Sequence, residues 1–363
     1  MVQAMRKPQL DGLRFVLFLL VFATHYARDP LRVGYLGYAL PVFFVMSGFL
    51  ITNVLVSAEH LDLATKLKVF YARRVLRICP SYFLVVGVLI AMDALTFPGY
   101  FLTYLVNFKL FAISLDPQSS IFQDWIGGNW RKESWHLWSL SVEEQFYILY
   151  PLVLYLTPAK YRVPMLFSVV LGSIVSRFLF KAYFPQAFYG AQLPVCAEYF
   201  AWGCLFSWWE ARKKLATLSP VWTFNLSLLA IFALIAVEFF RADSGYLQFR
   251  TTHYQTPIAV AMGFFVWGLW SLKPTHIAAR FLSCKPLVYF GEMSYTLYLV
   301  HLLAQYVFVA TKIDLPFSPH VDQIFGSFIL TMAMAMAIWH LFEKPVYSFR
   351  RYLPYGRPAK RLA

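Results

Sequence analysis

Long apolar runs, separated by short polar or basic stretches, follow one another along the whole chain of 363 residues. A helix needs about 20 mostly apolar residues to cross the ~30 Å hydrocarbon core of a bilayer. The stretch 100–113 is short and contains Lys109, so we expect it to be interfacial or re-entrant. We predict ten membrane spans, at residues 12–26, 36–56, 80–97, 138–157, 163–181, 193–209, 220–240, 255–272, 288–311 and 323–342.

The composition agrees with this pattern, because 60% of the residues are hydrophobic and only 14% are charged. No repeat or soluble segment is apparent. The predicted fold class is an all-α integral membrane protein, a single bundle of about ten transmembrane helices over residues 1–345, followed by a short basic cytoplasmic tail, 346–363. The four cysteines stand singly, which predicts neither a disulfide framework nor a metal site.

The formal net charge of +14 invites comparison with nucleic-acid-binding proteins. With the N-terminus inside, however, 21 of the 32 lysines and arginines fall in predicted cytoplasmic segments, which is the positive-inside pattern of membrane proteins. We therefore expect no nucleic acid partner, a multi-pass protein of the bacterial inner membrane, and both termini in the cytoplasm. The sequence does not indicate an oligomeric state.

Two ionisable residues share one face of the first span. Arg14 and His25 are eleven residues apart, which is three helical turns plus about 20°, and about 16 Å along the axis. Ionisable groups at membrane depth usually face the bundle interior and mark function. The alternative is that both side chains reach towards the two membrane interfaces.

The fourth span carries two adjacent carboxylates, Glu143 and Glu144. Adjacent helical residues point about 100° apart, so we expect only one of them to enter a cavity. A carboxylate close to His25 orients the imidazole and stabilises its protonated form. A structural ion pair with an arginine such as Arg177 is the alternative. His136, just before this span, is expected at the membrane interface together with its neighbouring tryptophans.

A basic amphipathic segment, 66–83, follows the second span and contains Arg73, Arg74 and Arg77. Such a helix commonly lies on anionic lipid. Arg74 and Arg77 are three residues apart on one face, and guanidinium groups suit bidentate phosphate binding, so a phosphorylated cytoplasmic ligand is the functional interpretation.

In the ninth span Ser294, Tyr298 and His301 form a stripe at i, i+4 and i+7. The stripe is a candidate cavity lining, and a contact between helices is the alternative. His340 and Glu343 are expected to be interface residues. The tryptophans near the outer mouth, Trp125, Trp130 and Trp135, are candidates for stacking on sugars or for interface anchoring.

Several motifs together resemble the acyltransferase-3 family of integral membrane acyltransferases. They are LDGLR followed by His25, FFVMSGFLIT, FYARRVLRICPSY, WSLSVEEQFY, SYTLYLVH and FEKP, in the family's order and over nearly the whole chain. One departure is Pro41 in ALPVFF, where many members have an aspartate, so any acceptor contact assigned to that aspartate is in doubt.

The resemblance implies transfer of an acyl group, commonly acetyl from cytoplasmic acetyl-CoA, to a hydroxyl of a glycan or glycolipid. It makes His25 the catalytic histidine, with Glu143 favoured over Glu144 as the functional acid, and Arg14, Arg73, Arg74 and Arg77 the acyl-CoA-binding residues. Acyl-CoA is then a co-substrate, and no tightly bound cofactor is implied. Some relatives carry an additional esterase-like domain, which the short tail does not provide, so we expect direct transfer to the acceptor, with a separate relay protein as the alternative.

Two mechanisms stay open, with His25 as general base or as the carrier of an acyl-imidazole intermediate. Three other readings of the chain also remain. These are a transporter or flippase of a lipid-linked glycan, a non-catalytic subunit of a polysaccharide synthesis complex, and acyl transfer to a small secondary metabolite. Neither the acceptor nor the acyl chain length can be read from the residues.

Overall fold

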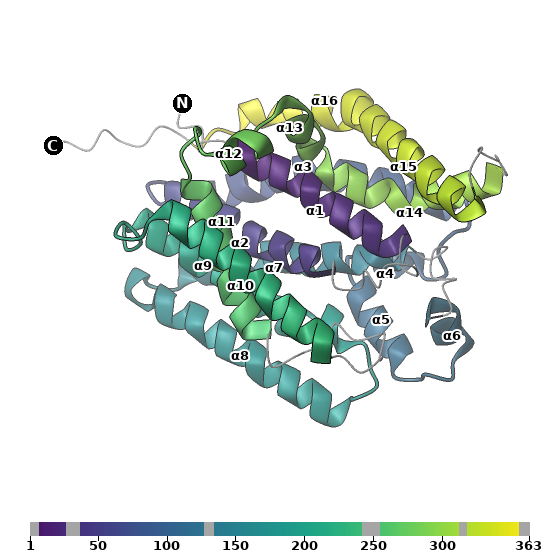
Figure 1. Ribbon diagram of the computed structural model, residues 1–363, viewed down its shortest axis with the longest axis horizontal. Coiled ribbons are helices and arrows are strands. Elements are labelled where there is room, and N and C mark those ends of the chain that lie inside the picture. The colour runs from purple at the N-terminus through teal and green to yellow at the C-terminus, as the bar shows by residue number, and fades with distance from the viewer. Residues whose placement is uncertain (1–6, 27–36, 127–133, 242–254, 312–317, 356–363) are drawn as a thin grey trace.

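The computed structural model describes residues 7–26, 37–126, 134–241, 255–311 and 318–355 (Figure 1). Within these ranges every regular element is a helix and no strand occurs, as the predicted all-α class requires. The long helices are α1 (Pro8–Tyr26), α2 (Ala39–Ser57), α3 (Leu63–Ala91), α7 (Trp138–Leu156), α8 (Arg162–Tyr183), α9 (Leu193–Ala211), α10 (Pro220–Arg241), α11 (Gln255–Ser271), α14 (Ser294–Thr311) and α15 (Pro319–Ile338).

The short helices connect the long helices or continue them. They are α4 (Pro98–Leu102), α5 (Val106–Ser114), α6 (Ser120–Ile126), α12 (Ile277–Leu282), α13 (Lys285–Glu292) and α16 (Lys344–Ser348). The predicted interfacial stretch 100–113 lies in α4 and α5, which have five and nine residues and are too short to cross a bilayer. The predicted tail begins inside α16, so the boundary after residue 345 interrupts a helix.

Five helices are long and apolar enough to cross a membrane, and six if one bent pair is counted as a span, among the residues that the structure describes. The bent pair is α13 and α14, which meet at 73°, so the predicted span 288–311 contains a break between them. Span 80–97 also differs, because it belongs to the 29-residue α3, which includes the basic segment and ends at Ala91. The count of ten spans stays a prediction.

Packing separates a central helix from peripheral ones. We compare the buried share of an 18-residue stretch in each helix. It is 61% in α2, 22% in the stretch that includes α8, and 17% in α10. Figure 1 shows α8 and α10 along one edge of the molecule and α15 along the opposite edge. The peripheral helices expose rows of large apolar side chains, as helices in contact with lipid do.

Helices α2 and α9 cross with their backbones in contact at two glycines. A Cβ atom on Gly48 would lie 2.1 Å from the carbonyl oxygen of Phe200, and one on Gly203 would lie 2.0 Å from that of Val45. Small residues at such crossings let two membrane helices approach closely and gain dispersion energy. This contact fixes α2, which carries one wall of the site described below.

The segments that the charge pattern assigns to one side of the membrane meet at one end of the bundle. Arg162, at the start of α8, forms an ion pair with Glu59, which follows α2, and its guanidinium lies 5.1 Å from the Trp208 ring of α9. The carbonyl oxygen of Tyr355 lies 3.1 Å from the His60 ring. This grouping agrees with the predicted topology, in which these segments are all cytoplasmic.

Candidate active site

Three histidines that are far apart in the sequence lie side by side. His25 is in the last turn of α1, His136 in the 3-10 turn Trp135–Leu137 before α7, and His301 in the middle of α14. The ring centroids are 5.0 Å apart for His25 and His301, and 4.7 Å for His136 and His301. The turn that carries His136 packs onto α14 and leaves this residue only 4% exposed, so its side chain faces the bundle, while its predicted depth at the membrane interface stays a prediction.

A main-chain carbonyl fixes the proton position on each imidazole. The Nδ1 atom of His25 lies 2.8 Å from the oxygen of Val21, and Nδ1 of His301 lies 2.7 Å from that of Tyr298. The Nε2 atom of His136 lies 3.1 Å from the same Tyr298 oxygen. Since a carbonyl only accepts hydrogen bonds, we assign the proton to these nitrogens, and the other nitrogen of each neutral ring then carries a lone pair.

Tyr298 and Ser139 connect the histidines to a pocket. The Tyr298 hydroxyl donates to the carbonyl of His136 at 2.8 Å and lies 2.6 Å from Ser139 Oγ. Both side chains line a cavity of about 100 Å³, several times the ~10–15 Å³ that one water needs, so a slender chain of atoms can enter. The other polar residues that line it are Arg14, Ser47, Arg74, Arg77, Glu143, Tyr147, Ser294 and Tyr295.

Part of the lining of this pocket is basic. It receives Arg14 from α1 and Arg74 and Arg77 from α3, which are close enough to repel one another electrostatically. Asp11 contacts Arg14 at 3.0 Å, and the Arg74 guanidinium lies 4.6 Å from the Tyr147 ring. Three converging guanidinium groups favour an anionic ligand.

Arg73 was predicted together with these arginines, but the structure places it elsewhere. Its guanidinium lies 5.0 Å from the ring of Tyr355 in the C-terminal segment. It is not among the described residues that line the pocket. Neighbouring helical residues point about 100° apart, so Arg73 and Arg74 cannot face the same space.

The two adjacent carboxylates diverge for the same reason. Glu143 lines the pocket and accepts hydrogen bonds from the hydroxyls of Ser47 and Tyr147. Glu144 points towards α3 and the turn before α5, where it acts electrostatically on Tyr82 and Tyr104. The expected contact between Glu143 and His25 stays a prediction, since the bonds described for Glu143 are made with α2 and within α7.

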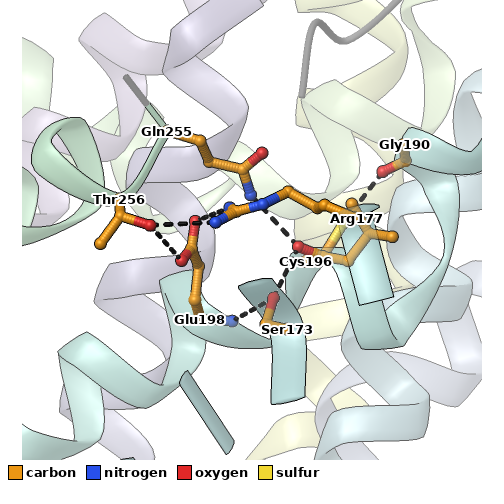
Figure 2. A network of polar contacts seen from close by, with 8 residues as sticks. Ser173, Arg177, Gly190, Cys196, Glu198, Gln255 and Thr256 are labelled. Atoms are coloured by element: carbon orange, nitrogen blue, oxygen red, sulfur yellow. Dashed lines mark hydrogen bonds and ion pairs between the residues drawn. The ribbon is translucent and has the colours of Figure 1, made fainter. Parts of the chain in front are cut away.

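The alternative ion pair of Glu143 or Glu144 with Arg177 is wrong. Arg177 on α8 forms a buried ion pair with Glu198 on α9 (Figure 2). Glu198 was not predicted from the sequence. Thr256 of α11 binds both partners, at 2.9 Å from the guanidinium and 3.0 Å from the carboxylate. This network fastens the peripheral α8 to the bundle and shares no residue with the pocket lining.

A second buried carboxylate, Glu343, was predicted at the interface but is only 1% exposed. It lies in a π-helical turn, Trp339–Glu343, and accepts hydrogen bonds from Thr296 and, at 3.3 Å, from Ser81. It attracts Arg77 electrostatically and so helps to place that guanidinium. The sequence contains a signal for this role of Glu343. A carboxylate directly after an apolar run is costly to bury without partners, so it indicates a buried polar contact. His340 is exposed, as an interface residue is.

The structure describes the side chain of one of the three tryptophans that were candidates for stacking on sugars, and that side chain is buried. Trp135 is 2% exposed and packs against Phe101 with ring centroids 5.8 Å apart, so it presents no open ring face. Trp130 and the side chain of Trp125 lie outside the described residues. No group of three or more histidine, cysteine or acidic residues in the described ranges is arranged to hold a metal ion.

The fold and site define a helical membrane protein with a pocket lined by three arginines and a cluster of three histidines, two of which neighbour Tyr298 of the pocket lining. The chain belongs to the acyltransferase domain family, acyltransferase-3, whose family model matches residues 7–340. This match confirms the resemblance carried by the motifs. No solved structure matches the chain significantly.

Several bacterial relatives are named O-acetyltransferases. O-acetyltransferase OatA of Staphylococcus aureus is 27% identical over 368 residues, covering 93% of this chain and 57% of its own length. Peptidoglycan O-acetyltransferase OatA of Listeria monocytogenes is 27% identical, with 81% and 48% covered. Putative peptidoglycan O-acetyltransferase YrhL of Bacillus subtilis is 24% identical, with 93% and 54% covered. The chain thus spans about half the length of these relatives.

Proposed function

We propose that this protein is a membrane O-acyltransferase. It moves an acyl group, most simply acetyl, from cytoplasmic acyl-CoA to a hydroxyl of an exported or cell-surface glycan or glycolipid. The observation that carries the proposal is one pocket whose lining includes three arginines and also Tyr298, a direct neighbour of two histidines. Family membership supports acyl transfer over the transporter and assembly-subunit readings.

The basic wall is the donor side. The phosphates of acyl-CoA bind Arg74 and Arg77, with Arg14 as a third cation, because guanidinium groups bind phosphate bidentately and an anion relieves their mutual repulsion. The thin pantetheine arm fits the narrow pocket and carries the thioester towards Ser139 and Tyr298. Acyl-CoA is a co-substrate in this scheme.

The imidazole side performs the transfer. In the assigned tautomer, the Nε2 lone pair of His25 accepts the proton of the acceptor hydroxyl while that oxygen attacks the thioester carbonyl carbon. The C–S bond then breaks, and the departing CoA thiolate takes up a proton, so the hydrogen count balances. General base catalysis of this type contributes about 10²- to 10⁴-fold. Glu143 holds the pocket wall beside the thioester through Ser47 and Tyr147.

The relatives support a glycan as the acceptor, since two of them carry peptidoglycan in their names. The clustering of basic segments at one end of the bundle supports a cytoplasmic donor side, with both termini there, in a bacterial inner membrane. We place the membrane domain at residues 1–345, the tail at 346–363, and the number of spans at ten. A small secondary metabolite is the alternative acceptor.

The proposal is tested with labelled acetyl-CoA and membranes that contain equal amounts of the wild type or His25→Ala. We expect label in the glycan or glycolipid fraction with the wild type alone. Equal label from both proteins, above a control of membranes without either, would remove His25 from the mechanism. Label with neither protein contradicts acetyl transfer, and export of a lipid-linked glycan without consumption of acetyl-CoA would favour the flippase.

A further inference from the structure

We propose that His301 shares the proton that His25 takes from the acceptor, a role that rests on the proposed acyl transfer. The proton accepted by His25 turns its ring into an imidazolium inside a bundle of low polarity. A buried charge of this kind is costly unless a neighbouring group accepts a hydrogen bond from it. The question is which group does so.

Two buried nitrogens are available beside His25. Nε2 of His301 and Nδ1 of His136 are both buried and have no hydrogen-bond partner among the residues that the structure describes. In the assigned tautomers these are the lone-pair nitrogens. A buried acceptor without a partner costs about 1–3 kcal/mol, and such exceptions call for a functional explanation.

Distance favours His301 over His136 as the partner of His25. The centroid of the His25 ring is 5.0 Å from that of His301 and 6.5 Å from that of His136. At a centroid distance of 5.0 Å, a small rotation of either ring or one bridging water can connect a protonated His25 to Nε2 of His301. The His136 ring lies 4.7 Å from that of His301, so the three imidazoles form a triangle with His301 at its corner nearest to both other rings.

The surroundings hold His301 in place for this role. Its Nδ1 atom donates to the Tyr298 carbonyl, and its own carbonyl accepts a hydrogen bond from Tyr26, the residue after His25. Phe18 covers the ring edge-on at a centroid distance of 6.2 Å, and His301 is 0% exposed. A ring so enclosed keeps its orientation.

The proton balance is complete without any additional reagent. The acceptor O–H bond breaks as its oxygen bonds to the acyl carbon, and the proton passes to Nε2 of His25. His301 shares that proton through its own Nε2 until the C–S bond breaks. The proton then goes to the CoA thiolate, and both imidazoles are neutral again. His301 is thus a positioning and proton-sharing residue that acts through His25.

Two substitutions at the same site test this role. In His301→Asn the amide nitrogen replaces Nδ1 and keeps the bond to Tyr298, while the Nε2 function is lost. In His301→Gln the amide oxygen stands near the position of Nε2 and accepts a hydrogen bond, but it cannot bind a proton. Both variants are compared with the wild type and His25→Ala at equal amounts of folded protein, with acetyl-CoA as donor.

We expect kcat for acetyl transfer to fall about 10- to 100-fold in both variants, with KM for acetyl-CoA within twofold of the wild type. Added imidazole is expected to restore part of the activity of His301→Asn, because the substitution leaves space for a second base. Wild-type kcat in either variant overturns the proposal. So does a loss that imidazole does not restore, which indicates a structural role. If the wild type itself transfers no label, the proposed function fails and this inference with it.

Discussion

The hydroxyl of Tyr26 donates a hydrogen bond to the main-chain carbonyl of His301. The residue next to the proposed base, His25, therefore binds α14, the helix that carries His301. Tyr26 is 4% exposed and its ring stacks on Phe22 with centroids 4.0 Å apart. One side chain thus sets the position of the end of α1 relative to α14. The distance between the two imidazoles depends on this contact.

Tyr26→Phe is expected to slow acyl transfer several-fold without changing KM for acyl-CoA. The ring packing remains, but α1 and α14 lose the bond that sets the spacing of the imidazoles, at a cost of about 1 kcal/mol. Tyr155→Phe is the matched control, because the Tyr155 hydroxyl bonds the Leu55 carbonyl at 2.9 Å, between other helices. Transfer kinetics and thermal unfolding in detergent should show a similar stability loss for both variants and a kinetic loss for Tyr26→Phe alone.

Arg74→Ala and Arg73→Ala are expected to differ sharply, although the residues are adjacent. Arg74 lines the pocket and Arg73 stacks on Tyr355 outside it. Loss of one charge-assisted phosphate contact, about 1.5–3 kcal/mol, should raise KM for acetyl-CoA about 10- to 100-fold in Arg74→Ala. Arg73→Ala should change it less than threefold. Equal effects in both variants would point to binding of the basic segment to lipid.

Gly203→Ala should destabilise the bundle, whereas Gly172→Ala should not. The added Cβ at position 203 meets the Val45 carbonyl of α2, while the one at position 172 in α8 has no atom within 4 Å. Overpacking at a helix crossing costs about 1–3 kcal/mol, and alanine at an open helical position gains up to about 1 kcal/mol. The Tm values of the two purified variants measure the difference. A wild-type Tm for Gly203→Ala would mean that α2 and α9 separate at little cost.

Glu198→Gln should lower stability while the folded protein keeps its kcat. The substitution leaves the buried charge of Arg177 without its partner, which costs about 3–5 kcal/mol in comparable cases. Replacing both residues, Arg177→Met with Glu198→Leu, should recover most of the Tm, because no unpaired charge remains. A kcat that stays low in the stable double variant would show that the network takes part in catalysis.

The sequence by itself determined the helical membrane character and most helix positions, because both depend on local runs of apolar residues. It also selected six of the polar side chains that line the pocket, namely Arg14, Arg74, Arg77, Glu143, Ser294 and Tyr298. Their spacing along a single helix defines a face, and ionisable residues within apolar runs stand out.

Only the tertiary structure decided which residues meet across helices. The contacts of His136 with His301, of Arg177 with Glu198, and of Glu343 with Thr296 each join different elements, and no spacing within one helix specifies them. The bend of 73° between α13 and α14 likewise lies where α13 packs on α1 and α14 packs on α15. Helix positions are local properties of the chain, whereas the partners of a buried polar group depend on which helices the whole bundle brings together.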